Sequence, residues 1–118
     1  VSPALGIGED RIAGIGARGG RRIATMVLLG LLEFFEGESP GDFVAAPRIH
    51  HQYLPDVISA EPDALSADVV ADLQSRGHTV SAGERSWGNM QSVVWDLRSN
   101  TLSAGTDPRG SVGKAEVR

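Results

Sequence analysis

Two adjacent glycines, Gly19 and Gly20, stand directly before a long apolar segment for which the sequence predicts a helix from about Gly20 to Phe35. The first N–H groups of a helix have no partner inside the helix, and the helix dipole favours negative charge there. Because glycine has no side chain, a ligand can approach this backbone closely. Such a turn can bind a phosphate, a carboxylate or a developing oxyanion. The residues alone favour the simpler interpretation, a plain strand-to-helix turn, and leave an anion site as the alternative.

Three arginines, Arg18, Arg21 and Arg22, flank this glycine pair. Cations at a helix N-terminus are unfavourable unless something negative faces them, because the helix dipole is positive at that end. The arginines therefore either bind an anionic ligand or are solvated at the surface. The spacing differs from that of a Walker loop, which needs a longer Gly-x-x-x-x-Gly-Lys frame.

The other residues with reactive side chains form no catalytic pattern that the spacing reveals. His50 and His51 are adjacent, so on a strand they would point to opposite faces and could not easily bind one metal ion. We expect a structural role for at least one of them, and a surface or packing role for His78. No serine lies in a Gly-x-Ser-x-Gly frame, which argues against a serine hydrolase of that kind. Asp107-Pro108-Arg109 could form an ion pair or a turn, and the sequence favours the turn.

Composition limits the classes of function further. The chain has 118 residues, which fits one domain, with 11 basic residues, 15 acidic residues and a formal net charge of −4. A surface that follows nucleic-acid phosphates usually needs the reverse balance. The chain has no cysteine, which excludes a disulfide framework, a thiolate metal site and a cysteine nucleophile. The longest apolar run, residues 26–32, is too short for a bilayer-spanning helix of roughly 20 residues.

The pattern of apolar and turn residues predicts mixed secondary structure around the glycine pair. Two hairpins are expected, the first at 4–16 with a polar turn at 9–11, the second from 90–97 to 102–104. The helix at 20–35 is apolar around most of its circumference, so we expect it to be buried on several sides. Shorter elements are expected as helices at 41–46 and 66–77, strands near 57–59 and 79–81, and a loose tail over 106–118. This order indicates an α+β fold with mostly antiparallel pairing.

Four stretches of the chain together resemble one known family. The first, at 16–23, reads Gly-Ala-Arg-Gly-Gly-Arg-Arg-Ile, against the family's Gly-Ser-Pro-Gly-Gly-Ser-Arg-Ile. The second, at 46–56, reads Ala-Pro-Arg-Ile-His-His-Gln-Tyr-Leu-Pro-Asp, against Ala-Pro-Arg-Phe-His-His-Gln-Trp-Leu-Pro-Asp. The third is Arg-Gly-His at 76–78, and the fourth runs from Asn-Met-Gln-Ser-Val-Val at 89–94 to Thr-Asp-Pro-Arg at 106–109. In order and spacing they resemble the C-terminal part of the small subunit of gamma-glutamyltransferases (gamma-glutamyltranspeptidases).

The resemblance implies an α+β fold that is part of an N-terminal-nucleophile hydrolase, in which helices sandwich two sheets of mostly antiparallel strands. It also implies that residues 1–118 form a single, incomplete domain. In that family a precursor cleaves itself, and the new N-terminal threonine of the small subunit is both the nucleophile and, through its amine, the base. The threonine takes up the gamma-glutamyl group of glutathione-type amides and passes it to water or to an amino acid. The family's oxyanion hole carries over to Gly19 and Gly20.

The same resemblance implies partners for this chain. Val1-Ser2-Pro3 resembles the end of the family's Ser-Ser-Met-Ser-Pro, so the nucleophilic threonine is expected in an upstream segment. That segment and a large subunit of the same precursor would be the protein partners, and a small gamma-glutamyl or related amide would be the substrate. No cofactor, metal, nucleic acid or membrane span in this chain is implied. Family members usually work outside the cytoplasm, in the periplasm or secreted, and a cytoplasmic location stays open.

Departures from the family pattern lie beside the glycine pair. Arg18 and Arg21 replace a proline and a serine, and Ala17 replaces another serine. This added positive charge suggests that Arg18 and Arg21 bind the substrate and that the substrate carries another carboxylate. Two alternatives stay open: a relative with a changed substrate, such as an acylase or an amide or C–C hydrolase of an antibiotic pathway, and a non-catalytic module that lost the nucleophile. The apolar surface of the helix at 20–35 argues against the module, since the rest of the chain is too small to cover it.

Overall fold

The computed structural model describes residues 3–83, 85–110, 114 and 116–117 of the chain. Contacts between residues gather into two compact units, one made of residues 1–46 with 88–118 and the other of residues 47–87. Each unit is described by itself. The single domain expected over 1–118 stays a prediction.

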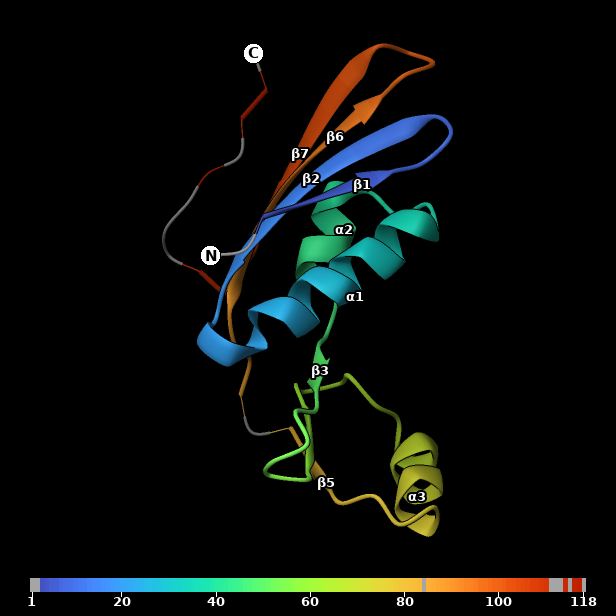
Figure 1. Ribbon diagram of the computed structural model, residues 1–118, viewed down its shortest axis with the longest axis vertical. Coiled ribbons are helices and arrows are strands. Elements are labelled where there is room, and N and C mark those ends of the chain that lie inside the picture. Colours follow the sequence, from blue (N-terminus) through green and yellow to red (C-terminus); the bar gives the residue numbers. More distant parts are fainter. Residues whose placement is uncertain (1–2, 84, 111–113, 115, 118) are drawn as a thin grey trace. The chain divides into compact units, whose positions relative to one another are not determined.

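The first unit is built on a four-stranded antiparallel sheet (Figure 1). Its strands are β1 (Ala4–Ile7), β2 (Arg11–Arg18), β6 (Asn89–Asp96) and β7 (Thr101–Thr106), in the spatial order β1-β2-β6-β7. Both expected hairpins are therefore confirmed, and β2 joins them by pairing with β6. The strand β2 runs to Arg18, so Gly19 follows it at once.

Two helices cover one face of this sheet (Figure 1). The chain leaves β2 through a 3-10 turn, Gly20–Arg22, and continues as α1 (Ile23–Phe35), followed by α2 (Pro40–Ala45). Alternate residues of the two central strands face the helices and are buried, as the period of two requires. The core consists of Ala13, Ile15, Ala17, Met90 and Val94 from the strands with Met26, Val27, Phe34, Phe43 and Val44 from the helices.

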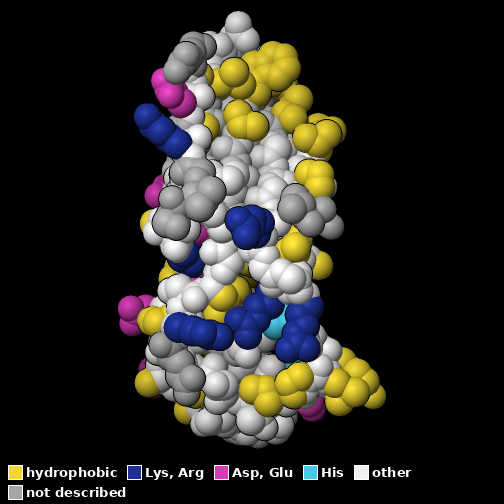
Figure 2. Space-filling model, turned by 90° about the vertical axis from the view of Figure 1, so that its left-hand side faces the viewer, with side chains coloured by type: hydrophobic (Ala, Val, Ile, Leu, Met, Phe, Trp, Pro, Cys, Tyr) yellow, Lys and Arg dark blue, Asp and Glu magenta, His cyan; other side chains and the backbone are white. Residues whose placement is uncertain are grey.

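The other face of the sheet is exposed and largely apolar. It carries Leu5 and Ile7 of β1, Val93 and Trp95 of β6, and Leu102 of β7, all exposed. Leu5, Val93 and Leu102 line a groove of about 940 Å³ on this face, which Lys114, Glu116 and Val117 of the C-terminal segment also line. Figure 2 looks onto this side of the molecule and shows hydrophobic side chains gathered towards its upper end. We call these residues the open face. A contiguous apolar surface of this kind marks an interaction surface in a native protein.

The outer side of α1 is also uncovered. Leu28, Leu32 and Phe35 lie one helical turn apart and are all exposed, while Met26, Val27, Gly30 and Phe34 are buried. The helix contacts α2 as well as the sheet, but its outer side finds no partner among the described residues, so the expected burial is only partial there. This agrees, for the described residues, with the expectation that the rest of the chain is too small to cover the helix.

The second unit is small and has a three-stranded sheet of its own. Its strands are β3 (Ile49–His50), β4 (Ile58–Ala60) and β5 (Val80–Ala82), in the order β3-β4-β5. The β3–β4 pair is antiparallel and the β4–β5 pair is parallel, with α3 (Ala67–Ser75) between β4 and β5 in the chain. The Ser66 side chain accepts a hydrogen bond from the Val69 N–H at 3.3 Å and so caps α3, as the sequence predicts. Among the described residues, no helix is long and apolar enough to cross a bilayer.

Candidate active site

The glycine pair forms a turn between β2 and α1 whose backbone requires glycine at one position. Gly20 has a φ of 59°, a left-handed conformation that side chains disfavour, although the space around its Cα is open. Gly19 has an extended φ of 162°, and its carbonyl accepts a hydrogen bond from the Arg22 N–H at 3.2 Å, which closes the turn. The structure thus places a defined, exposed peptide turn where the sequence predicts a helix start.

The N–H groups of Gly19 and Gly20 have no partner among the described residues. Neither Gly19 nor Gly20 donates a hydrogen bond there, and both residues are exposed. No side chain caps the 3-10 turn or α1, and the first turn of each contains no acidic residue. The free donors and the positive end of the α1 dipole therefore remain available to an anion or a developing oxyanion.

Two arginines flank the turn without an ion-pair partner in the described part of the chain. Arg18 is the last residue of β2 and Arg21 lies within the 3-10 turn, and both are exposed. The ion pairs formed by other arginines of this chain join Arg76 to Asp72, Arg98 to Asp10 and Arg109 to Asp107. Since Arg18 and Arg21 make no such pair with those residues, their charge adds to the positive potential of the turn.

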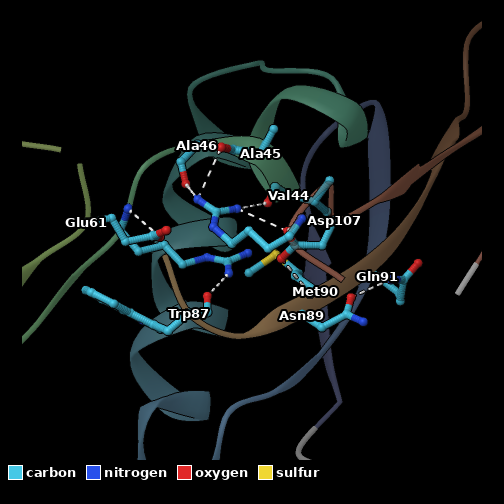
Figure 3. A network of polar contacts seen from close by, with 11 residues as sticks. Val44, Ala45, Ala46, Glu61, Trp87, Asn89, Met90, Gln91 and Asp107 are labelled. Atoms are coloured by element: carbon cyan, nitrogen blue, oxygen red, sulfur yellow. Dashed lines mark hydrogen bonds and ion pairs between the residues drawn. The ribbon is translucent and has the colours of Figure 1, made fainter. Parts of the chain in front are cut away.

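A buried ion pair ties the end of β7 to the end of α2 (Figure 3). The Asp107 carboxylate accepts hydrogen bonds from the Met90 N–H at 2.9 Å, the Arg109 N–H at 2.9 Å and the Arg109 guanidinium at 3.1 Å. The same guanidinium donates to the carbonyls at the C-terminal end of α2, those of Val44 at 3.0 Å, Ala45 at 3.3 Å and Ala46 at 2.9 Å. It therefore satisfies carbonyls that the helix itself leaves unpaired.

This ion pair corrects two expectations. A loose tail from residue 106 is wrong, because Thr106 ends β7 and Asp107 is fully buried. At 107–109 the sequence favours a turn over an ion pair, whereas the structure shows both: the chain turns there, and Asp107 and Arg109 form an ion pair. The sequence contains the two opposite charges of this pair, two residues apart on either side of a proline. Residues 111–113, 115 and 118 of the expected tail lie outside the described residues.

The two adjacent histidines stabilise a loop of the second unit. His50 is buried and its Nε2 lies 2.8 Å from Gln52 Oε1, while His51 Nε2 lies 2.7 Å from Asp56 Oδ1. The Tyr53 N–H also donates to His51 Nδ1 at 3.4 Å. These contacts support the structural role expected for this pair, and His78 is exposed, as expected.

The second unit also has a buried arginine. The Arg48 N–H donates to Glu61 Oε1 at 3.0 Å, and the Glu61 N–H donates in return to the Arg48 carbonyl at 2.9 Å. The Arg48 guanidinium donates to the Trp87 carbonyl at 2.7 Å (Figure 3). Both ends of the 47–87 segment are thereby fastened together around β3 and β4. Arg48 lies within the second family-like stretch, but its pairing with Glu61 depends on the fold and could not be predicted from the sequence.

Comparison with known proteins assigns the class. The family model described as gamma-glutamyltranspeptidase matches residues 3–117. A solved acivicin-inhibited gamma-glutamyltranspeptidase superimposes with a TM-score of 0.84 at 26% identity, over 94% of this chain and 61% of that one. The α+β fold is therefore part of an N-terminal-nucleophile hydrolase. Within that class, the chain belongs to the gamma-glutamyltranspeptidase family, and the resemblance read from the four stretches is confirmed.

Relatives in sequence are much longer than this chain. Scoloptoxin SSD14 of Scolopendra dehaani is 34% identical over 109 residues, which are 89% of this chain and 18% of that protein. The glutathione hydrolase proenzyme of Pseudomonas aeruginosa is 31% identical over 114 residues, which are 93% of this chain and 20% of that protein. The chain thus spans about a fifth of the length of these two relatives.

Proposed function

We propose that this chain forms the C-terminal portion of a gamma-glutamyltransferase-like hydrolase or acyltransferase, and that the Gly19 and Gly20 N–H groups form its oxyanion hole. One observation carries the proposal: these donors are free on an exposed turn at the N-terminal end of a helix packed on the sheet. The turn lies at the Gly-Gly position of the family pattern. Backbone donors aimed at a developing oxyanion are a large contribution to acyl-transfer catalysis.

In the proposed reaction, the threonine nucleophile belongs to the part of the protein outside this chain. Its hydroxyl oxygen attacks the gamma-carbonyl carbon of the substrate while its own amine takes the hydroxyl proton. The carbonyl oxygen becomes an oxyanion, which the N–H groups of Gly19 and Gly20 stabilise. Collapse breaks the C–N bond, the proton passes to the leaving amine, and an acyl-enzyme remains. Water or an amino acid then takes the acyl group through the same oxyanion site.

The uncovered apolar surfaces support a larger assembly. The open face and the outer side of α1 both expose large hydrophobic side chains, among them Trp95, Leu102 and Phe35. In the proposed enzyme, the upstream segment and the large subunit of the same precursor cover such surfaces. This arrangement gives the burial that one small unit cannot provide alone.

The reaction class is tested on the complete protein with a gamma-glutamyl anilide. We expect release of the aniline and, on rapid quenching, a polypeptide heavier by one gamma-glutamyl group that begins with threonine. A correctly folded and processed protein that gives neither product would contradict the proposal and favour the non-catalytic module.

A second candidate, a family relative with a changed substrate, is favoured by the free charges of Arg18 and Arg21. In this version, the two guanidiniums bind an additional carboxylate on the substrate. The test compares kcat/KM for two gamma-glutamyl amides, one with glutamate and one with a neutral alkylamine as the leaving group. Arg18→Pro and Arg21→Ser, which restore the family residues, are expected to lower the preference for the glutamate amide about tenfold.

Arg98→Ser is the matched control for this comparison. Arg98 is also exposed, but it lies at the other end of the sheet, where its guanidinium pairs with Asp10 at 2.8 Å. We expect its substrate preference to equal that of the unchanged protein. An unaltered preference in the Arg18 and Arg21 variants would rule out the changed substrate and leave the gamma-glutamyl reaction intact.

A further inference from the structure

The thioether of Met26 lies directly behind the Gly19 peptide. Met26 is on the first turn of α1 and its side chain is 0% exposed. A Cβ atom built on Gly19 would overlap Met26 Cε and lie 3.6 Å from Met26 Sδ. The φ of Gly19 lies outside the left-handed region, and the obstacle to a side chain at this position is the Met26 thioether.

Gly88, directly before β6, lies against the same Met26 side chain. It directly precedes β6, and the pairing of Arg18 with Asn89 brings it to the end of β2. A Cβ atom on Gly88 would overlap Met26 Sδ and lie 3.0 Å from Met26 Cε and 3.2 Å from the Arg18 carbonyl. Gly88 also has a φ of 82°, a conformation that favours glycine. The Met26 side chain therefore lies between two glycines, one directly after β2 and the other directly before β6.

We propose that Met26 is a positioning residue for the oxyanion hole, held against Gly88 and fixing the Gly19 peptide from behind; this rests on the proposed function. The Gly19 and Gly20 N–H groups make no hydrogen bond among the described residues that could hold them. Apart from the hydrogen bond that its carbonyl accepts from the Arg22 N–H, the position of Gly19 depends on packing, and Met26 supplies the side-chain atoms nearest to the Cβ position of Gly19. A displacement of about 1 Å in a catalytic group can cost a hundredfold in rate, so this contact bears on turnover.

The first test replaces the thioether in the complete protein. Met26→Ala is expected to lower kcat at least tenfold and to change KM less than threefold, because substrate binding precedes the need for exact donor placement. Met26→Leu, which conserves most of the volume, is expected to keep kcat within about threefold. Met90→Ala is the matched control, since Met90 is 1% exposed in the same core but faces Gly30 rather than Gly19. It should lower the melting temperature comparably and leave kcat close to that of the unchanged protein.

The second test adds a methyl group at Gly19 and then removes the Met26 side chain that it would overlap. Gly19→Ala places a methyl group into Met26 and is expected to lower kcat strongly. Adding Met26→Ala removes the overlap, so the double variant is expected to have a kcat at least tenfold above that of Gly19→Ala alone. Folded protein is quantified by active-site titration with a covalent gamma-glutamyl inhibitor, so that kcat refers to competent enzyme only.

Two results would overturn the positioning role. One is a Met26→Ala enzyme whose kcat equals that of Met90→Ala at matched loss of stability. The other is a double variant no faster than Gly19→Ala. Either result leaves the oxyanion hole itself untouched, because that is tested separately by removing the Gly20 N–H. If removal of the Gly20 N–H lowers kcat but Met26→Ala lowers it no more than Met90→Ala does, only the role of Met26 is refuted.

Discussion

The guanidinium of Arg109 spans the C-terminal end of α2 and is held there by the fully buried carboxylate of Asp107, at 3.1 Å. The guanidinium donates to the last carbonyls of α2, and the Asp107 carboxylate accepts a hydrogen bond from the N–H of Met90, a core residue of β6. A short segment after the last strand thereby joins α2 to the sheet that carries the glycine turn.

The first prediction concerns this pair. Arg109→Met removes the charge partner of a buried carboxylate and leaves three helix carbonyls without their donor, so it should cost about 3–5 kcal/mol. Peptide-level hydrogen exchange of the complete protein should show faster exchange over 40–46. Arg98→Met is the matched control, because its ion pair with Asp10 is exposed and worth less than about 1 kcal/mol. Equal exchange in the two variants would contradict the structural importance of the buried pair.

The second prediction concerns pH and the β6–β7 turn. The N–H and the side chain of Ser99, and then the Arg98 N–H, hold the pKa of Asp96 below its ordinary value, because they favour the carboxylate. A lowered pKa in the folded state stabilises the turn above the unfolded pKa of about 4, and this contribution is lost as pH falls through the folded pKa. Titration of the Asp96 carboxyl carbon by NMR should therefore give a midpoint below 4, and Ser99→Ala should raise it. A midpoint at or above the ordinary value would contradict this.

The third prediction concerns the open face. Val93→Asp should strongly destabilise the complete protein, because the charge would be buried against the covering segment without a partner. Val69→Asp on α3 is the control, since Val69 is 45% exposed and Val93 is 42% exposed in this chain, and the substitution is the same. We expect a large loss of melting temperature or of the processed two-chain form for Val93→Asp only. Equal, small effects would show that the open face faces water in the complete protein.

Much of the fold could be predicted from the sequence because local patterns determine it. Alternating apolar residues mark the two hairpins, and the apolar run at 23–35 marks α1. Ser66 at the start of α3 has the capping geometry that its type predicts. The glycine pair and the helix that follows it are also apparent from the sequence, although the residues alone favour a plain turn over an anion site.

The rest could not be predicted because it depends on contacts between distant segments. Met26 packs against both Gly19 and Gly88, which are 69 positions apart in the chain. The exposed outer side of α1 was missed because an apolar helix shows only that it needs partners, and those partners belong to the remainder of a longer protein in the proposed enzyme. At 107–109 the sequence favours a turn over an ion pair, because the stability of the pair comes from its burial and from the carbonyls of α2.

The most direct test of the account removes a single hydrogen-bond donor. Replacing the Gly20 amide by an ester, through incorporation of glycolic acid at position 20 of the complete protein, deletes the N–H and preserves the left-handed backbone at φ 59°. The same replacement at Gly41, an exposed glycine whose N–H also lacks a partner among the described residues, is the control. The oxyanion hole predicts a fall in kcat of about a hundred- to a thousandfold at position 20, little change in KM, and full activity for the control. Full activity of the Gly20 ester would contradict the oxyanion role of this turn.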